Sequence, residues 1–356
     1  MYTHLGSVTL RTGEQLDLGC VRCPDPSWGE QVMPLLGHKS LETRDHFQAA
    51  FAGPLDELDT RFYIGTIGGF AVTNVMIVGA HRAGGLPVNS SGGDLHEHTS
   101  EVPDAASVAA VGILGHVYTR PEHRQKGAYS ALMPVAMDHL RRDGYRALTL
   151  GTGFETHPYW IYHGHGFRSI DAVSGKMKWL AEPDFEQHWF RPGATTVREL
   201  RWDDWAPLNL LACQPAAADE ALPRSLLFNL KGQGNLEGPF QVVQRRRRRG
   251  ESVTALVLES VTGATVGWAA LQPDPLAFGD GRQLDLYVHP HFEEDAAKLL
   301  AALSWPGETR VAAYTTSASD YRAAALREAG FTDVAQLPAW LARAGERLPL
   351  RVFARG

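Results

Sequence analysis

The sequence is poor in cysteine, has no excess of positive charge and contains no long apolar run. Three cysteines among 356 residues cannot form a disulfide framework for a chain of this size, so we expect a reducing, cytoplasmic compartment. Lys and Arg total 34 against 40 Asp and Glu, a net charge of −6 that argues against a general nucleic-acid binder. No run reaches the roughly 18 apolar residues of a membrane span, and the first residues lack the charged-then-apolar pattern of a signal peptide. The sequence therefore predicts a soluble protein with neither a nucleic-acid partner nor a membrane partner.

The sequence offers two weak metal signals and completes neither. Cys20 and Cys23 have C-x-x-C spacing, but a structural zinc site needs a second pair and only Cys213 remains. A redox pair and two ordinary thiols on a strand both fit this spacing. The segment His96–His98 carries two histidines around a glutamate, without a partner elsewhere that would complete a site. We therefore expect no metal.

The length and composition predict two folded domains. Domains usually run to about 100–200 residues, and 356 residues fit two of them. Hydrophobic residues make up 44% and charged residues 21%, which excludes wholesale disorder. Residues 181–195 contain proline and glycine and shift in composition, which is typical of a linker. We expect domains at 1–180 and 196–356.

The first half reads as an alternation of strands and helices. A long loop rich in Gly, Ser and Asp (82–105) interrupts it, and Gly68–Gly69 marks a hairpin turn. Strands are predicted at 17–24, 61–80, 107–119 and 146–151, and helices at 40–53, 128–142 and 157–165.

The second half repeats this order. A hairpin is predicted at 254–272, strands at 284–290 and 310–315, and helices at 292–304 and 318–329. Tyr118–Pro121 matches Tyr287–Pro290 at an offset of 169 residues, and Gly166–Phe167 matches Gly330–Phe331 at an offset of 164. The sequence thus predicts a duplicated α/β (α+β) domain, each copy a mixed central sheet flanked by helices.

The turn between strand 107–119 and helix 128–142 carries the strongest chemical signal. The start of a helix offers unpaired backbone N–H groups and a positive dipole end, which attract anions. Gly127 lets a bulky phosphate approach the backbone, and Arg124 and Lys126 add positive charge. The spacing matches neither a Walker loop nor a dinucleotide-binding fingerprint. A pyrophosphate site and a solvated basic turn are the two interpretations.

The segment TRPEHRQKGAYSALM, between a strand and a helix, followed downstream by YHGHGF, resembles the GCN5-related N-acetyltransferases (GNAT). Their signature is [QR]-x-x-G-x-[GA]. Arg124 and Gly127 match it, whereas Tyr129 stands where Gly or Ala is usual. The resemblance implies two tandem GNAT-like domains and an acyl-CoA co-substrate, either acetyl-CoA or another acyl-CoA.

The resemblance also implies where the co-substrate binds. The pyrophosphate would lie on the backbone N–H groups of the turn, and the strand end would pair with the pantetheine arm. The implied cofactor-binding residues are Tyr118, Thr119, Arg124, Gln125, Lys126, Gly127, Ala128, Tyr129 and Ser130.

Two residues are candidates for catalysis. Tyr162 stands five residues before Phe167, where the resemblance implies a tyrosine that protonates the departing thiolate. A purely packing role for Tyr162, among other aromatics, is the alternative. His116 is a candidate general base, or a buried histidine, because strand alternation does not settle which face it occupies. The implied reaction is direct attack of a primary amine on the thioester, with a backbone N–H near Thr119 stabilising the oxyanion.

The second half does not reproduce this site. Glu293, Asp295 and Ala296 stand in place of Arg124, Lys126 and Gly127 of the first half, and Leu326 in place of the tyrosine. Acidic side chains at a helix start repel a pyrophosphate. We therefore expect a degenerate copy without a CoA-binding turn.

The run Arg245–Arg249 admits two interpretations: an exposed strand or hairpin, and a docking patch for an acidic partner. For the whole chain the leading hypothesis is an acyl-CoA-dependent N-acyltransferase acting on a small-molecule or peptide amine. The alternatives are a non-catalytic acyl-CoA-binding regulatory module and a protein-interaction scaffold.

Overall fold

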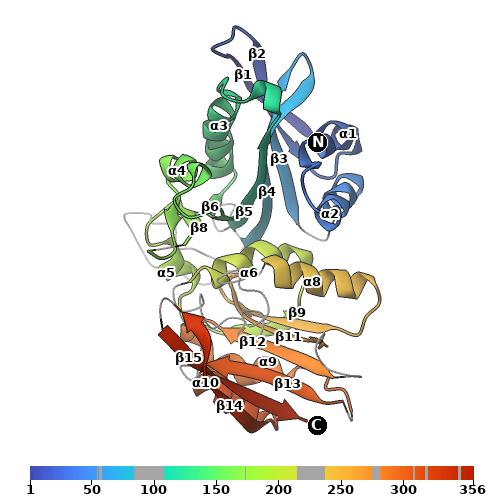
Figure 1. Cartoon of the computed structure of the whole chain (residues 1–356), viewed down its shortest axis with the longest axis vertical. Helices are drawn as coiled ribbons and strands as arrows, with labels where there is room; N and C mark the ends of the chain where they lie inside the picture. The colour runs from blue at the N-terminus through green and yellow to red at the C-terminus, as the bar shows by residue number, and fades with distance from the viewer. Residues whose placement is uncertain are drawn as a thin grey trace, which may run out of the picture. The chain divides into compact units, whose positions relative to one another are not determined.

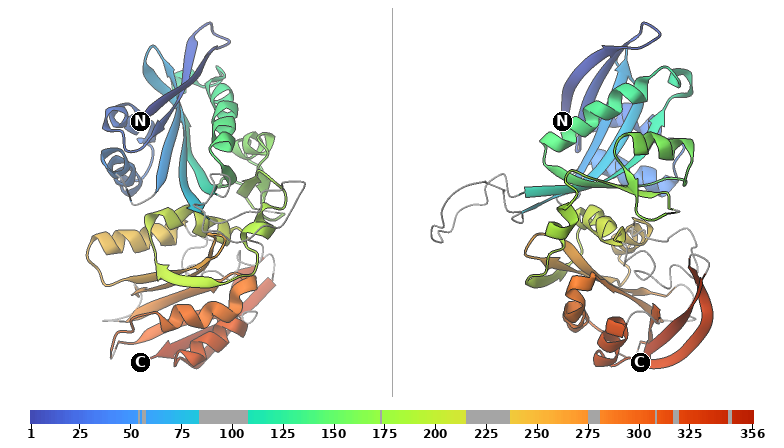
Figure 2. Two further views of the ribbon diagram at one scale, coloured as in Figure 1. Left: turned by 180° about the vertical axis from the view of Figure 1, so that it is seen from behind. Right: turned by 90° about the vertical axis from the view of Figure 1, so that its left-hand side faces the viewer.

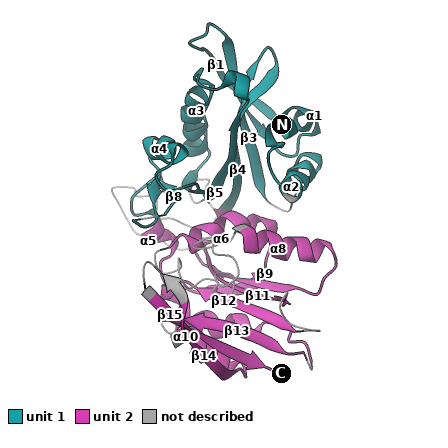
Figure 3. Cartoon of the chain, in the orientation of Figure 1, with its two compact units in different colours: residues 1–81, 109–185 teal, residues 82–108, 186–356 magenta. Residues whose placement is uncertain are grey.

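The computed structural model describes residues 1–53, 55, 58–83, 108–172, 174–214, 237–274, 281–307, 309–316, 320–343 and 346–356. Most of the predicted 82–105 loop, including His96–His98, lies outside these residues. The chain divides into two compact units (Figure 3). Unit 1 comprises residues 1–81 and 109–185, and unit 2 comprises residues 82–108 and 186–356.

The sheet of unit 1 is eight-stranded, in the order β1-β2-β3-β4-β5-β6-β8-β7 (Figure 1). Neighbours β5 and β6 run parallel, whereas β1, β2, β3 and β4 pair antiparallel in succession. The strands are β1 (Tyr2–Thr9), β2 (Gln15–Arg22), β3 (Asp59–Ile67), β4 (Phe70–Ala83), β5 (Val108–Thr119), β6 (Tyr145–Gly151), β7 (Arg168–Ser169) and β8 (Lys176–Leu180).

Helices cover both faces of this sheet, with α1 and α2 on one side and α3 and α4 on the other (Figures 1 and 2). The Ser40 side chain caps α2 by accepting a hydrogen bond from the Thr43 N–H, as the predicted helix start requires. The helices are α1 (Pro26–Val32), η1 (Met33–Leu36), α2 (Leu41–Ala52), η3 (Pro121–His123), α3 (Ala128–Arg142) and α4 (His157–Gly164), where η marks a 3-10 helix.

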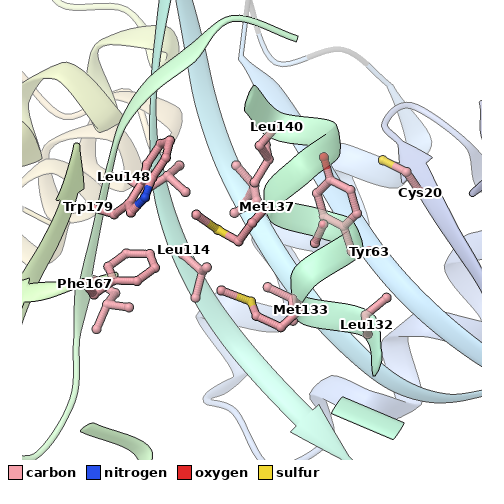
Figure 4. Packing of buried hydrophobic residues seen from close by; sticks show 14 of the residues in the cluster. Cys20, Tyr63, Leu114, Leu132, Met133, Met137, Leu140, Leu148, Phe167 and Trp179 are labelled. Carbon is pink, nitrogen blue, oxygen red and sulfur yellow. The ribbon is translucent and has the colours of Figure 1, made fainter. Parts of the chain in front are cut away.

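The core of unit 1 lies between α3 and the sheet. Apolar residues recur along α3 at spacings of three and four, so one face of the helix is buried. Figure 4 shows Met133 and Met137 of α3 directed toward Leu114 of β5 and Leu148 of β6, with Leu132 on the side of the helix nearer Tyr63 of β3. This packing fixes the start of α3 relative to the end of β5, which is where the basic turn lies.

Unit 2 has a seven-stranded sheet in the order β14-β15-β13-β12-β11-β10-β9. Its one parallel pair among the described strands is β12 with β13. The strands are β9 (Thr195–Glu199), β10 (Thr254–Ser260), β11 (Thr265–Pro273), β12 (Arg282–Val288), β13 (Val311–Thr316), β14 (Thr332–Arg343) and β15 (Glu346–Arg355). The helices are η4 (Trp202–Asp204), α6 (Trp205–Ala212), α8 (Glu237–Arg248), η5 (Pro290–Asp295), α9 (Ala296–Ala301) and α10 (Asp320–Glu328), and α5 (Phe185–Trp189) lies at the unit boundary.

The two sheets share one topology. Strands β2-β3-β4-β5-β6-β8-β7 of the first sheet correspond in order to β9-β10-β11-β12-β13-β15-β14 of the second. Equivalent backbone bonds recur: the Arg120 N–H donates to the Val72 carbonyl, and the His289 N–H, 169 residues later, donates to the Val266 carbonyl. The prediction of two mixed sheets, each flanked by helices, is confirmed.

Several elements differ from the sequence-based expectations, and three of these differences matter below. Strand β1 was not predicted. The expected helix 292–304 is instead the 3-10 helix η5 followed by the short α9. Four of the five arginines, Arg245–Arg248, form the last turn of α8, so the prediction of an exposed strand or hairpin is wrong. The Arg247 guanidinium donates to the Leu200 and Ala255 carbonyls, and that of Arg246 donates to the Pro273 carbonyl, so part of the run packs against unit 2 itself.

Among the described residues, none of the helices is both long enough and apolar enough to cross a membrane.

Candidate functional site

The end of β5 separates from β6. The two strands pair only from Ala110 to Ile113 of β5, although β5 continues to Thr119. Leu114 and Val117 pack in the same core cluster although they are three residues apart, which a regular strand does not allow. His116 between them has a φ of 48°, so the strand bulges here and leaves backbone groups of its last residues without a partner in β6.

The turn after β5 is held open by two left-handed residues. It begins with η3, where the Arg124 N–H donates to the Pro121 carbonyl. Gln125 then adopts a φ of 61° and Gly127 a φ of 93°. Left-handed residues alternating with ordinary ones turn successive N–H groups toward one side of the chain, a concavity that binds anions. A Cβ at position 127 would meet no atom within 4 Å, so this side of the turn faces open space.

Six consecutive backbone N–H groups at this turn have no hydrogen-bond partner among the residues that the structure describes. The first bond of α3 runs from the Ala131 N–H to the Gly127 carbonyl, at 3.0 Å. Within the described part of the chain, the N–H groups of residues 125–130 donate no hydrogen bond to protein. Buried or half-buried N–H groups need an acceptor, so this row offers a site for an oxygen-rich anion.

A cavity of about 510 Å³ lies against these N–H groups. It has three walls: the β1–β2 hairpin, the turn with the first residues of α3, and α4. The lining residues are Val8, Thr9, Leu10, Arg11, Thr119, His123, Arg124, Gln125, Lys126, Gly127, Ala128, Tyr129, Ser130, Ala131, His157 and Ile161.

Basic side chains line the cavity, and two of them, Lys126 and Arg124, have different partners. The Lys126 ammonium lies 3.4 Å from a Glu14 carboxylate oxygen. Arg124 folds back, because its Nε donates to the Thr119 carbonyl at 3.0 Å and its guanidinium lies 5.4 Å from the centre of the Tyr118 ring. Arg124 therefore braces the turn against the end of β5 in addition to supplying charge.

Tyr162 lies beside the cavity rather than in its lining. Its neighbour Ile161 lines the cavity, while the Tyr162 ring packs on the core, 6.1 Å from the ring of Phe167. Burial raises the pKa of Tyr162 to about 12, so the hydroxyl stays protonated at physiological pH. Tyr129, at the position that departs from the GNAT signature, also turns onto the core, and burial raises its pKa too.

His116 faces α2 rather than α3. Its ring meets that of Phe47 edge-on with centres 5.0 Å apart, and its carbonyl accepts a hydrogen bond from the Asn74 side chain. Burial lowers the pKa of His116 to about 3, with Lys39 acting in the same direction. The imidazole is therefore neutral at physiological pH. Sequence alternation could not assign this face because the bulge shifts the register.

The structure gathers most of the predicted binding residues at one cavity. Eight of the eleven predicted site residues line it, and His116, Tyr118 and Tyr162 do not. Sequence reasoning missed the hairpin wall from Val8 to Arg11. A signal was present, because alternating apolar residues flank Thr12–Gly13, a pattern typical of a hairpin.

Cys20 and Cys23 carry free thiols. Burial raises the pKa of Cys20 to about 11 and that of Cys23 to about 12, so neither is a reactive thiolate at neutral pH. Within the described ranges, no group of three or more His, Cys, Asp or Glu residues is placed to hold a metal ion.

No protein-family model and no curated protein sequence matches the chain. Among solved structures, the chain is similar to a ribosomal-protein-alanine N-acetyltransferase from Brucella melitensis, at 21% identity and a TM-score of 0.32 over 45% of this chain and 98% of that one. It is similar to an N-acetyltransferase from Staphylococcus aureus, at 10% identity and a TM-score of 0.34 over 46% of this chain and 98% of that one. A GNAT-superfamily phosphinothricin acetyltransferase from Sinorhizobium meliloti, solved with acetyl-CoA, gives 16% identity and a TM-score of 0.31 over 45% and 87%. All three are acetyltransferases.

Proposed function

We propose that unit 1 binds an acyl-CoA at the turn after β5 and transfers the acyl group to an amine. The observation that carries this proposal is the row of six unpartnered backbone N–H groups at residues 125–130, facing a cavity with basic side chains. A pyrophosphate supplies the oxygen acceptors and the negative charge that such a row requires.

The fit extends from the turn to the strand. Gly127 leaves the turn open on the cavity side, and Lys126 adds a positive charge there. The last residues of β5, Tyr118 and Thr119, have no partner in β6. The Tyr118 carbonyl accepts a hydrogen bond from the Thr73 hydroxyl, and the Thr119 carbonyl accepts one from Arg124. We assign the edge of this stretch that lacks a β6 partner to the amide groups of the pantetheine arm, which can pair with strand backbone as another strand would.

Different residues of the chain would then stabilise the oxyanion, protonate the leaving sulfur and assist the attacking amine. A backbone N–H near Thr119 would stabilise the charge that develops on the carbonyl oxygen when a primary amine attacks the thioester. Tyr162, kept protonated by its raised pKa, would donate its proton to the departing sulfur. His116 is the candidate base: it is neutral, and its buried Nδ1 has no hydrogen-bond partner among the described residues. Its low pKa makes it a weak base, so it would act on an amine that arrives neutral by accepting a hydrogen bond from its N–H, and the proton that the amine loses after attack would go to solvent.

Calorimetry with CoA and acetyl-CoA tests the binding step. We expect micromolar binding to the wild-type chain and its loss in Arg124→Glu/Lys126→Glu, because the two new carboxylates repel the phosphates. The matched control is Arg141→Glu/Arg142→Glu, which makes the same charge change at the far end of α3, outside the cavity lining, and should bind as the wild type does. Equal loss in both double variants would show a general charge effect and not a site.

A panel of amines then tests the transfer step, with release of free CoA thiol as the readout. Transfer from acetyl-CoA to at least one amine supports the enzyme. Tight binding without transfer to any amine would favour a non-catalytic acyl-CoA-binding module, and no binding by the wild-type chain would overturn the proposal.

A further inference from the structure

The β1–β2 hairpin forms a rigid wall of the cavity. Its turn is closed by two backbone bonds, from the Leu10 N–H to the Glu14 carbonyl at 2.8 Å and from the Gly13 N–H to the Leu10 carbonyl at 2.9 Å. Leu10 and Leu16, on either side of the turn, are buried in the core of unit 1. The core thus fixes the position of Arg11 between them, at the edge of the cavity.

Two charged residues of this hairpin, Arg11 and Glu14, lie near the cavity and differ in whether they have a partner. Arg11 lines the cavity, is exposed, and makes no hydrogen bond or ion pair with any residue that the structure describes. Glu14 instead pairs with Lys126 of the turn at 3.4 Å, and it also accepts a hydrogen bond from the Thr12 hydroxyl at 2.7 Å. The hairpin therefore presents one uncommitted cation and one carboxylate that holds a cation of the opposite wall.

The β1–β2 hairpin is a feature of unit 1 that the described part of unit 2 does not share. Strand β9 is the counterpart of β2 and is the last strand of its sheet, so β1 has no counterpart among the described strands of unit 2. The added strand occurs in the unit that has the open turn and the cavity. Core packing alone does not require it, because the second sheet shares the topology of the first without it.

We propose that Arg11 binds a phosphate group of the bound acyl-CoA, and that this ligand competes with Glu14 for Lys126. The inference rests on the proposed function. The guanidinium carries five N–H donors in a planar fork that matches phosphate oxygens, so an uncommitted arginine on a cavity wall suits this ligand. The Glu14–Lys126 pair must loosen before Lys126 can turn fully to the ligand, so Glu14 lowers the affinity.

Substitutions of the two hairpin residues should change the Kd for CoA in opposite directions. In calorimetric titration with CoA, Arg11→Ala should raise the Kd about tenfold, because it removes a charge-assisted hydrogen bond to phosphate. Glu14→Gln should lower the Kd by about two- to fivefold, because a partly exposed ion pair of modest strength no longer holds Lys126. Loss of folding would weaken binding in both variants, so it cannot produce this pattern. Arg142→Ala, which removes an arginine outside the cavity lining, is the matched control and should leave the Kd unchanged.

Shortened ligands locate the phosphate. Pantetheine should bind the wild type and Arg11→Ala equally, because it carries no phosphate. Dephospho-CoA lacks the 3′-phosphate: if the Arg11 effect disappears with it, Arg11 binds that group, and if the effect persists, Arg11 binds the pyrophosphate.

Three results would overturn the inference. They are an unchanged Kd for CoA in Arg11→Ala, an equal loss for pantetheine, and an unchanged or weaker affinity in Glu14→Gln. If the wild-type chain binds no CoA at all, the proposed function fails instead, so the two failures are distinguishable.

Discussion

The turns that follow β5 and β12 occupy the same place in two sheets of one topology, yet they differ in backbone. After β5 the chain passes through left-handed Gln125 and Gly127 before α3 begins, and six N–H groups donate no hydrogen bond within the part of the chain that the structure describes. After β12 the 3-10 helix η5 leads directly into α9, Ala296 has a φ of −57°, and its N–H donates to the Glu293 carbonyl. The same fold therefore has an open turn with unpaired N–H groups in one unit and a closed helix start in the other.

A second pair of positions differs only in the side chain. The Phe167 N–H donates to the Tyr162 carbonyl, and 164 residues later the Phe331 N–H donates to the carbonyl of Leu326. Gly166 and Gly330 before these phenylalanines have φ values of 91° and 84°. Unit 2 thus retains the local backbone but has an apolar side chain where unit 1 has a hydroxyl. The scaffold is shared, and the proposed chemistry depends on a short turn and one hydroxyl that only unit 1 has.

The largest effect is expected when the Tyr162 hydroxyl is removed. Tyr162→Phe should lower kcat by about 10²–10⁴-fold, the usual contribution of a positioned proton donor, with little change in the Kd of CoA. The raised pKa, about 12, keeps wild-type Tyr162 protonated across the assay range. Deprotonation of Tyr162 should therefore not lower the kcat of the wild-type enzyme below about pH 10. The measurement is kcat against pH with the amine found in the screen.

Tyr129→Phe is the matched control, because Tyr129 is a neighbouring half-buried tyrosine whose pKa is also raised by burial. It should keep most of kcat. Full kcat in Tyr162→Phe across the pH range would remove the catalytic difference between the two units and leave Tyr162 with a packing role only.

Much of this comparison was predictable from sequence. The match of Tyr118–Pro121 to Tyr287–Pro290 and the alternation of elements predict the duplicated fold, which the two sheets confirm. Glu293 and Asp295, in place of Arg124 and Lys126, predict a second unit without a CoA-binding turn, and this stays a prediction. These predictions rest on local patterns, such as apolar periodicity and helix caps, that need no tertiary information.

The features that sequence could not supply depend on contacts between distant segments. The face of His116 depends on a bulge, since one extra residue in a strand reverses every later side chain. The packing of Arg247 on the Leu200 carbonyl turns an arginine run into part of the fold. The approach of Arg11 to the turn after β5 arises only when the sheet forms, because more than 100 residues separate them in the chain.

An intermediate effect tests the backbone difference directly. Gly127→Ala should weaken CoA binding by about tenfold, because an alanine at a φ of 93° is strained by roughly 1–2 kcal/mol and its Cβ projects toward the ligand. The matched substitution in unit 2, Ala296→Gly, should leave CoA binding unchanged and cost only about 0.5–1 kcal/mol of stability. Calorimetry gives the Kd and chemical denaturation gives the stability. Equal Kd values for Gly127→Ala and the wild type would show that the left-handed turn is not what the ligand requires.

The smallest effect is expected from substitutions that place the charges of the unit 1 turn at the start of α9 in unit 2. Glu293→Arg/Asp295→Lys reproduces the charges of Arg124 and Lys126, and it is made in the Arg124→Glu/Lys126→Glu background so that unit 1 does not bind. We expect no CoA binding, because the Ala296 N–H remains bonded to the carbonyl of residue 293 and charge alone does not open the turn. We also expect a modest loss of stability, since Asp295 accepts hydrogen bonds from the Thr195 hydroxyl and Lys298 and stabilises the start of α9. Micromolar binding regained in calorimetry would mean that side-chain charge, and not the backbone row of N–H groups, distinguishes the two units.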